Sequence, residues 1–162
     1  MIYDNLNVKD YEDDELFKYY DEEYDKHICS DGSEQKAKHY SRLLYKPVDS
    51  IVDIGCGSAE FLKEFVRLIK PKKIVGTDIS MSLLKKAQQN NPKVNFYRAD
   101  SKILPFKNKE FDLAIMVDLL EHVKSPEKTL QEASRVARQI LIKVPLEDNL
   151  FLNIYKILVE ER

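Results

Sequence analysis

Short apolar runs alternate with segments of helical periodicity along this chain from Asp49 onward. The runs are nearly continuous in apolar residues, and they read SIVDI (50–54), KIVGT (73–77), VNFY (94–97), FDLAIMV (111–117) and QILIKV (139–144). Strands that are buried on both faces have this pattern, because helices cover both sides of a parallel sheet. The pattern therefore predicts an α/β fold with a doubly wound, mostly parallel sheet.

The segments between these runs carry apolar residues at the spacing of one helix face. The stripes are Phe61, Leu62, Phe65, Val66, Leu68 and Ile69; then Met81, Leu84 and Ala87; and then Leu130, Ala133 and Ala137. Ser80 and Ser125 stand at expected helix starts, where a serine side chain can cap the first turn. The segment 101–110 is too short and interrupted for a helix, so we expect a loop there.

The two ends of the chain have helical periodicity without strand runs. An acidic and aromatic segment covers 10–25, and a second amphipathic segment runs from Ser33 to Tyr45. We therefore predict an N-terminal helical cap over 1–47, a sheet core over 48–145 and a C-terminal helix over 146–162. No internal repeat divides the chain, so we expect one domain over 1–162.

Composition narrows the class of protein. Of 162 residues, 43% are hydrophobic and 33% charged, a balance typical of one globular domain with its own core. The net charge of −2 gives no general attraction to nucleic acid. Because the start does not resemble a signal peptide and no apolar stretch reaches the ~20 residues that span a bilayer, we expect a cytoplasmic protein with no membrane partner. Cys29 and Cys56 have no second cysteine or histidine at ligand spacing, which predicts no metal site.

The strongest chemical signal is IVDIGCGSAEF, in which a predicted strand runs into Gly55, Cys56 and Gly57 and then into a helical stripe. In an open parallel sheet such a turn lies where strand order reverses, and glycines allow a ligand to approach the backbone. The first four predicted strands also end at aspartates, which are Asp53, Asp78, Asp100 and Asp118. Because the carboxyl ends of parallel strands share one edge, these carboxylates should line one rim.

An acidic rim selects its ligand by charge. It would repel the phosphates of a dinucleotide or a nucleoside triphosphate. S-adenosyl-L-methionine instead brings a sulfonium, an ammonium and two ribose hydroxyls, which carboxylates can hold. A nicotinamide-dependent oxidoreductase is disfavoured on a second ground, because its Gly-x-Gly-x-x-Gly fingerprint would put Glu60 where the third glycine belongs.

The ordered set of motifs resembles the class I, Rossmann-like S-adenosylmethionine-dependent methyltransferases, and within them the methyltransferase domain 11 or UbiE-like branch. The resemblance runs from about Tyr20 to Val144 and rests on DIGCGSA, IVGTDIS, NFYRADS, LPFKNKEFD and DLLEHV. It implies a methyltransferase with S-adenosyl-L-methionine as cofactor and S-adenosyl-L-homocysteine as product, and it makes 48–145 the cofactor-binding core. The DLLEHV and LPFKNKEFD segments resemble members that modify small molecules, which favours a small-molecule acceptor over protein or RNA.

The resemblance also implies roles for individual residues. Gly55, Cys56 and Gly57 form the loop beneath the methionine part of the cofactor. Asp53 shapes that loop or meets the ammonium, directly or through water. Asp78 binds the ribose hydroxyls, at the distance past the glycine turn that one strand-helix-strand unit demands.

Further along the chain, the resemblance places Ile79 against the adenine, and Asp100 with Ser101 at the adenine edge. Asp118 lies near the methionine part and the entrance for the acceptor. Methyl transfer needs alignment and exclusion of water more than a catalytic triad, so the catalytic residues stay unassigned. An acceptor that must lose a proton would need a general base, for which His122 is the nearest candidate, although a histidine there can equally support the loop.

The chain departs from the family pattern at two places. Ala59 stands where a third glycine is usual. The chain also stops at Arg162, whereas members normally continue after the fifth strand with a helix and two further strands, so the C-terminal strands of the family are expected to be missing. We therefore expect 139–144 to be an unpaired edge, covered together with the C-terminal helix by a second copy, a partner chain or a C-terminal continuation absent from this sequence.

Missing C-terminal strands would leave the acceptor site open. The alternative function is accordingly a catalytically weak or inactive S-adenosylmethionine-binding module that acts as a partner subunit. Formation of S-adenosylhomocysteine distinguishes an enzyme from such a module.

Overall fold

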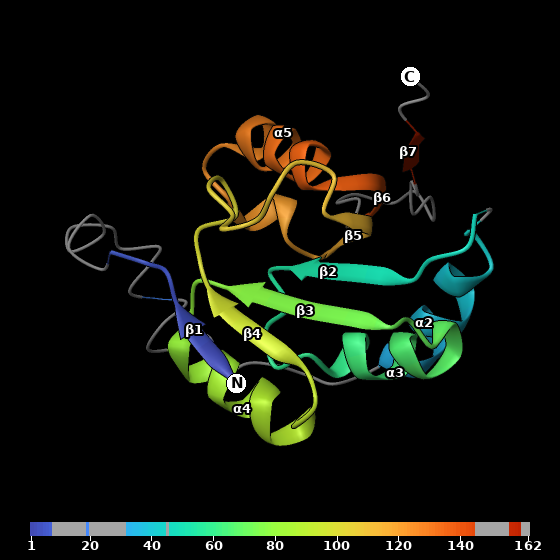
Figure 1. Ribbon diagram of the computed structural model, residues 1–162, viewed down its shortest axis with the longest axis horizontal. Helices are drawn as coiled ribbons and strands as arrows, with labels where there is room; N and C mark the ends of the chain where they lie inside the picture. The colour runs from blue at the N-terminus through green and yellow to red at the C-terminus, as the bar shows by residue number, and fades with distance from the viewer. Residues whose placement is uncertain (8–18, 20–31, 45, 145–155, 160–162) are drawn as a thin grey trace, which may run out of the picture.

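The computed structural model describes residues 1–7, 19, 32–44, 46–144 and 156–159. They contain a seven-stranded sheet with the strand order β1-β4-β3-β2-β5-β6-β7. The strands are β1 Ile2–Asp4, β2 Ser50–Ile54, β3 Lys73–Asp78, β4 Asn95–Arg98, β5 Phe111–Val117, β6 Ala137–Lys143 and β7 Lys156–Val159. All neighbouring strands are parallel except β6 and β7. The predicted doubly wound, mostly parallel sheet is confirmed (Figure 1).

Helices lie on both faces of the sheet. They are α2 Ser33–Ser41, α3 Glu60–Ile69, α4 Met81–Asn90, the 3₁₀ helix η4 Leu120–His122 and α5 Pro126–Val136. Helices α2, α3 and α4 cover one face and α5 covers the other (Figure 1). Within β5, Leu113 and Ile115 join the core under α3, whereas Ala114 and Met116 join the core under α5. A continuous apolar run thus fills two cores, because successive strand residues point to opposite faces.

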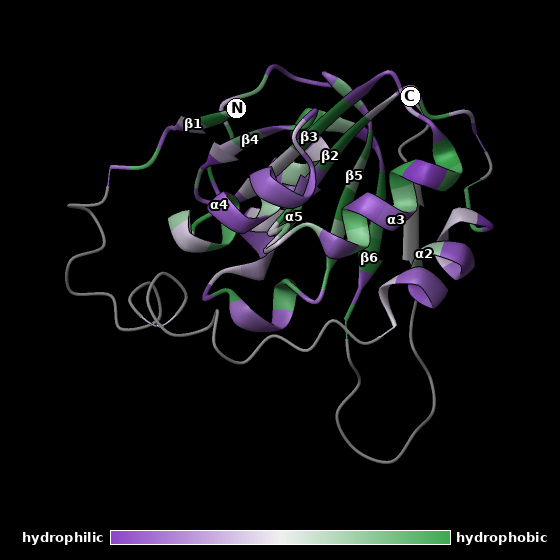
Figure 2. Cartoon of the chain, turned by 90° about the horizontal axis from the view of Figure 1, so that it is seen from below, coloured by the Kyte–Doolittle hydropathy of each residue, from purple (hydrophilic) through white to green (hydrophobic). Residues whose placement is uncertain are grey.

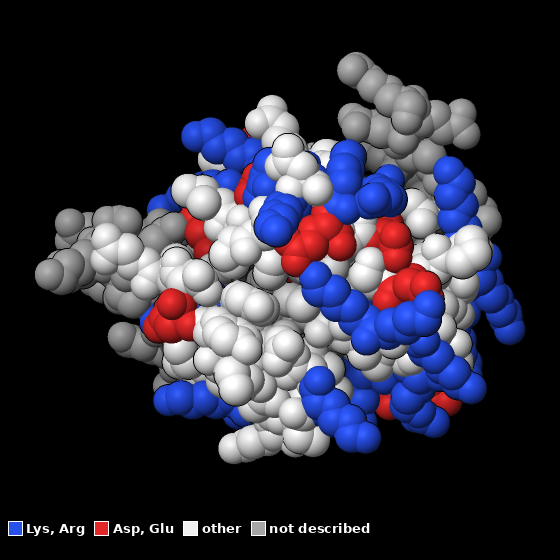
Figure 3. Space-filling view, in the orientation of Figure 1, with Lys and Arg blue, Asp and Glu red and all other residues white. Residues whose placement is uncertain are grey.

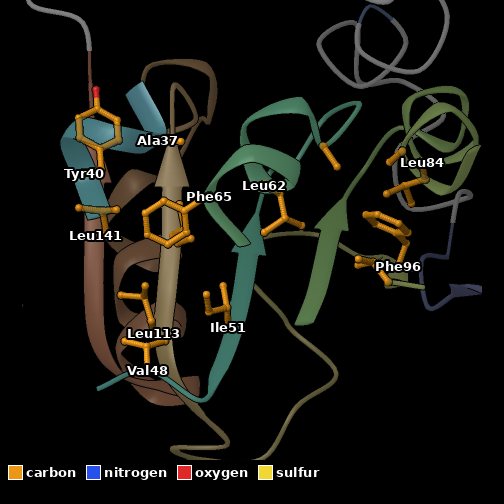
Figure 4. Close-up of a cluster of buried hydrophobic side chains, with 14 residues drawn as sticks. Ala37, Tyr40, Val48, Ile51, Leu62, Phe65, Leu84, Phe96, Leu113 and Leu141 are labelled. Atoms are coloured by element: carbon orange, nitrogen blue, oxygen red, sulfur yellow. The ribbon is translucent and has the colours of Figure 1, made fainter. Parts of the chain in front are cut away.

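The larger core lies between the sheet and α2, α3 and α4 (Figure 4). Tyr40 of α2, Phe65 of α3 and Leu141 of β6 are all buried in it. Phe61 joins α2 to α3 through ring contacts with Tyr40 and Phe65, at centroid distances of 5.9 and 5.4 Å. Because burial of one such side chain contributes about 1.5–3 kcal/mol, this packing fixes α2 against the sheet.

Polarity follows these layers. Figure 2 shows hydrophobic colour along the central strands and hydrophilic colour on the outer sides of the helices. On the face seen in Figure 3, basic and acidic side chains lie next to one another. Oppositely charged side chains also pair across the sheet, as Lys73 does with Glu110 (2.6 Å), and partly exposed pairs of this kind each contribute only about 0–1 kcal/mol. Within the described residues, no helix combines the length and the hydropathy needed to cross a bilayer.

Strand order reverses beside β2. From β2 the chain passes through α3 to β3 and through α4 to β4, and it then returns to β5 on the other side of β2. The turn that follows Ile54 therefore lies where the chain connections run to opposite sides, toward β3 on one side of β2 and toward β5 on the other. This is the switch point of an open parallel sheet, where ligands bind outside the carboxyl ends of the strands.

The start of the chain differs from the predicted helical cap over 1–47. Ile2–Asp4 form a strand, β1, which pairs in parallel with β4 and stacks Tyr3 on Tyr97 with ring centroids 4.7 Å apart. The edge of β4 supplies the hydrogen-bonding partners of these residues. A strand of three residues is too short to show a hydrophobic periodicity in the sequence, so it was not predicted. The second N-terminal helix is confirmed as α2, whereas the helix predicted over 10–25 lies almost wholly outside the described residues.

Helix boundaries agree with the predictions at some positions and not at others. Ser80 caps α4 by accepting a hydrogen bond from a first-turn amide (3.2 Å), as predicted. Ser125 precedes α5, but its side chain makes no capping bond. Ala137, expected on the helix, is the first residue of β6. The segment 101–110 forms a loop, as predicted.

The predicted C-terminal helix over 146–162 is wrong at 156–159, which form β7. This strand is antiparallel to β6, with Lys156 opposite Ile142 and Val159 opposite Gln139. Accordingly, β6 is not an unpaired edge over 139–142, and one of the strands expected to be missing is present. The unpaired N–H and C=O groups of a strand edge favour pairing with a segment that contains β-branched residues. The periodicity of the C-terminal segment could not predict this pairing, because it contains no information about the edge of β6.

Candidate functional site

The turn that leaves β2 contains two glycines in left-handed conformations. Gly55 has a φ of 71° and Gly57 a φ of 53°. The amides of Gly55 and Cys56 both donate to the carbonyl of Thr77 in β3, at 2.8 and 2.9 Å. These bonds hold the turn against the neighbouring strand. Other residues lose about 1–2 kcal/mol in this conformation, which explains why glycine suits both positions.

The two glycines differ in their surroundings. A Cβ atom at Gly55 would lie 2.6 Å from Cδ1 of Leu119, which follows β5. A Cβ atom at Gly57 would meet no atom of the described residues within 4 Å. Gly55 therefore serves close packing inside the protein, whereas Gly57 leaves room for a ligand to approach the backbone.

Ala59, in the place of the usual third glycine, keeps a glycine-like backbone. Its φ is 59°, and it is buried at the start of α3. Its amide donates to the Cys56 carbonyl (2.8 Å) and closes the turn. The departure from the family pattern therefore does not alter the course of the turn.

Asp53 is a buried carboxyl group, 3% exposed, next to the turn. None of the described residues donates a hydrogen bond to its side chain. Burial, and secondarily the charge of Asp78, raises the pKa of Asp53 to about 8. A proton keeps such a group neutral, and a cationic group of a ligand can replace that proton.

Asp78, the last residue of β3, holds the turn from the side. One carboxylate oxygen accepts from the Gly57 amide (2.8 Å) and the other from the Ser80 amide (2.9 Å). The fold thus brings Asp53, Gly57 and Asp78 together, as predicted. It also makes Asp78 a support of the turn, which the spacing in the sequence does not reveal.

The residues predicted for the adenine side follow β3 and β4. The carbonyl of Ile79 accepts from the Nε of a buried β4 arginine (2.9 Å). Asp100 is buried, and one of its oxygens lies 3.1 Å from Nζ of Lys102. Oγ of Ser101 lies 3.0 Å from Oγ1 of Thr129 in α5. These contacts anchor the three residues at the carboxyl ends of their strands.

Asp118 follows β5 and is the centre of an ion-pair cluster. Its φ is 55°, and its two oxygens contact different lysines. Lys143 of β6 contacts Oδ1, and Nζ of Lys36 in α2 lies 3.3 Å from Oδ2. The sequence pattern does not single out these lysines, because they are 25 and 82 positions away from Asp118. The four aspartates thus lie at or just beyond the carboxyl ends of neighbouring parallel strands, but each has a different environment.

Two further predicted residues lie near these groups. Burial, followed by the charges of Asp78 and Asp53, holds the pKa of the Cys56 thiol well above its ordinary value, so Cys56 stays a neutral thiol in the turn. His122 ends η4, with Nε2 3.9 Å from Oε1 of Glu121. Its side chain is partly exposed, which leaves the imidazole accessible to solvent.

Residues 52–140 match the family described as "Methyltransferase domain". The tRNA (carboxymethyluridine(34)-5-O)-methyltransferase of Saccharomyces cerevisiae is 32% identical over 122 residues, which cover 67% of this chain and 40% of that protein. The 2-phytyl-1,4-naphtoquinone methyltransferase of Nostoc is 32% identical over 100 residues, which cover 57% of this chain and 44% of that protein. The chain thus spans less than half the length of either relative.

Solved structures share the fold. A chain in the complex between the Haloferax volcanii Trm112 methyltransferase activator and a methyltransferase has a TM-score of 0.67 and 22% identity, covering 80% of this chain and 60% of that chain. Haemonchus contortus phosphoethanolamine N-methyltransferase 1, in complex with phosphoethanolamine and S-adenosylhomocysteine, has a TM-score of 0.67 and 20% identity, covering 82% and 32%. Both follow the same arrangement of strands and helices over the matched parts.

Proposed function

The chain belongs to the methyltransferase-domain family, whose members use S-adenosyl-L-methionine, and from this premise we propose that it transfers the methyl group of this cofactor to an acceptor. The observation that carries the proposal is the turn after β2, where a Cβ atom at Gly57 would meet open space among the described residues and the carboxyl groups of Asp53 and Asp78 lie close to the turn. This set of groups fits the cofactor, because glycine admits a ligand to the backbone and carboxyl groups suit a cation and hydroxyls.

We assign the methionine part to the glycine turn. Gly55, Cys56 and Gly57 form the loop beneath it, and Asp53 meets the ammonium directly or through water. Asp78 takes the ribose hydroxyls. The two oxygens of Asp78 accept the amides of Gly57 and Ser80, and these bonds fix the carboxylate beside the turn where we place the ribose.

We assign the adenine to Ile79, Asp100 and Ser101, and the acceptor entrance to Asp118. Strand order supports this division. The first three residues follow β3 and β4 on one side of β2, whereas Asp118 follows β5 on the other side. The cofactor would then lie across the switch point, with its reactive end toward β5.

When bound, the cofactor would supply an electrophilic methyl group, activated by its sulfonium, to a lone pair of the acceptor. The residues of this chain bind and orient both partners and exclude water. His122 is the candidate to take a proton from an acceptor that must lose one.

For the acceptor we propose a small molecule, on the resemblance of DLLEHV and LPFKNKEFD to members of that kind. One relative is named for a naphthoquinone and the other for tRNA, so their names support either class. An S-adenosylmethionine-binding module without turnover is the second candidate function, because the groups at the glycine turn would bind the cofactor in such a module just as they would in an enzyme.

Titration calorimetry with S-adenosylmethionine, S-adenosylhomocysteine and NAD tests the cofactor assignment. We expect a saturable heat of binding with the first two ligands and none with NAD. A heat of binding with NAD alone would overturn the proposal. Conversion of S-adenosylmethionine to S-adenosylhomocysteine in the presence of a metabolite pool or of tRNA then tests turnover. Binding without conversion in either pool would favour the module.

A further inference from the structure

Lys36 and Lys143, named here the lysine pair, contact one carboxylate from two different elements. Lys36 projects from α2 with its Nζ 3.3 Å from Oδ2 of Asp118, and Lys143 ends β6 and contacts Oδ1. The side chain of Lys143 is 12% exposed, against 37% for Lys36 and 32% for Asp118. Each oxygen of Asp118 therefore faces a different ammonium, and Lys143 is the more buried of the two lysines.

Among the described residues, the two ammoniums of the lysine pair share one carboxylate, that of Asp118, which balances only one of their two charges. Burial, followed by the charge of Lys36, lowers the pKa of Lys143 although Lys143 contacts Asp118. Both causes disfavour the ammonium form. A second anion near the lysine pair would offset the repulsion between the two ammoniums and would be held by both of them.

The position of Lys143 separates the lysine pair from the nucleoside end of the proposed cofactor site. The glycine turn leaves β2, and β5 lies between β2 and β6. Asp78 ends β3 and Asp100 follows β4, and both strands lie on the opposite side of β2 from β6. A group that reaches Lys143 therefore approaches from the side where the acceptor entrance is proposed.

We propose that the lysine pair binds a carboxylate group of the methyl acceptor, so that the acceptors of this protein carry an ionised carboxyl group. This inference rests on the proposed function. The two ammoniums each contact one oxygen of the Asp118 carboxylate. Their separation therefore matches the size of a carboxylate group. A lysine ammonium is a compact charge that accepts a carboxylate from several directions, and the pair would repel a cationic acceptor.

Side-chain NMR of the lysines tests this inference without relying on turnover. The whole chain is first saturated with S-adenosylhomocysteine, and acetate is then titrated as the probe, with acetamide as its neutral counterpart. We expect the signals of Lys36 and Lys143 to shift saturably with acetate and not with acetamide.

Two variants and a control assign the shifts. Lys143→Met and Lys36→Met keep the methylene stem and remove the charge, and each should weaken acetate binding at least ~10-fold, because a charged hydrogen bond is lost. Lys38→Met removes a lysine of the same helix that pairs with the exposed Glu34, and it should bind acetate as wild type does. A thermal melt of each variant confirms that it is folded.

Three results would overturn the inference. One is a wild-type protein that binds S-adenosylhomocysteine but shows no acetate shift, which leaves the proposed function intact. The second is an equal shift with acetamide. The third comes from a second titration, without S-adenosylhomocysteine: acetate binds the ligand-free chain, and S-adenosylhomocysteine abolishes this binding. In that case Lys143→Met should also weaken the binding of S-adenosylhomocysteine but not that of 5′-methylthioadenosine. That third result would show that the pair holds the carboxylate of the cofactor instead. Failure to bind S-adenosylhomocysteine at all would overturn the proposed function itself.

Discussion

Asp78 accepts a hydrogen bond from the backbone amide of Gly57 at 2.8 Å, so the last residue of β3 supports the turn that leaves β2. Its other oxygen accepts from the Ser80 amide, at the start of α4. A residue in this position links ligand binding to the stability of the turn. Substitutions there should change both quantities, and the two effects can be measured separately.

Asp78→Ala should weaken the binding of S-adenosylhomocysteine roughly 10- to 150-fold, because a charged acceptor worth about 1.5–3 kcal/mol is removed from the ribose. It should also lower the free energy of unfolding by about 1–3 kcal/mol, because two amides lose their acceptor. Calorimetry measures the first effect and urea denaturation the second. Asp49→Ala is the matched control, since Asp49 forms an exposed pair with Lys72. A folded Asp78→Ala protein with wild-type affinity would show that the ribose assignment is wrong.

Gly76→Ala should destabilise the protein through a steric clash beneath the turn. The added Cβ would lie 2.6 Å from the buried ring of Phe96 and 2.9 Å from Sγ of Cys56. Overpacking of this kind costs about 1–3 kcal/mol, and Phe96→Leu should relieve part of it, giving a coupling of about 0.5–3 kcal/mol in a double-mutant cycle. Gly57→Ala, which meets no described atom within 4 Å, should show no such coupling with Phe96→Leu. Additive effects for Gly76→Ala and Phe96→Leu would contradict the predicted clash.

Asp53 should make the stability of the ligand-free protein depend on pH. Its pKa rises from 3.8 to about 8 on folding, so the folded state binds this proton more tightly than the unfolded state. Its contribution to the free energy of unfolding is full below the lower value and declines as pH rises toward the higher one, by up to about 1.4 kcal/mol per pH unit. Asp53→Asn should remove this slope. Urea denaturation of both proteins across the interval compares them, and parallel pH profiles would argue against a protonated Asp53.

Removal of β7 should expose the edge of β6 and cause self-association. Over 139–142 the backbone of β6 pairs with 156–159, and a chain that ends at residue 155 would leave those N–H and C=O groups without their partners. Light scattering should then show larger species as the protein concentration rises. A chain that ends at Val159 keeps β7 and serves as the control. If both chains scatter alike, β7 does not protect this edge.

The sequence alone determined the central strands, and it placed the glycine turn and the aspartates at their carboxyl ends. The run 111–117 was expected as a strand and is β5, because residues buried on both faces of a sheet must be apolar at every position. Gly57 and Asp78 could be placed together from sequence because one strand-helix-strand unit fixes their separation. These features follow from local patterns that recur wherever such a sheet forms.

Only the tertiary structure decided the edges of the sheet and the charges around the site. The two edge strands, Ile2–Asp4 and 156–159, form because β4 and β6 have backbone groups that they can pair with. The local sequence of these two segments does not show that such partners exist. The contact of Lys36 with Asp118 joins residues 82 positions apart. The pKa of Asp53 depends on burial by surrounding elements, and not on its neighbours in the chain. Hydrogen bonds, ion pairs and desolvation act through space, so they exist only once the fold has brought their partners together.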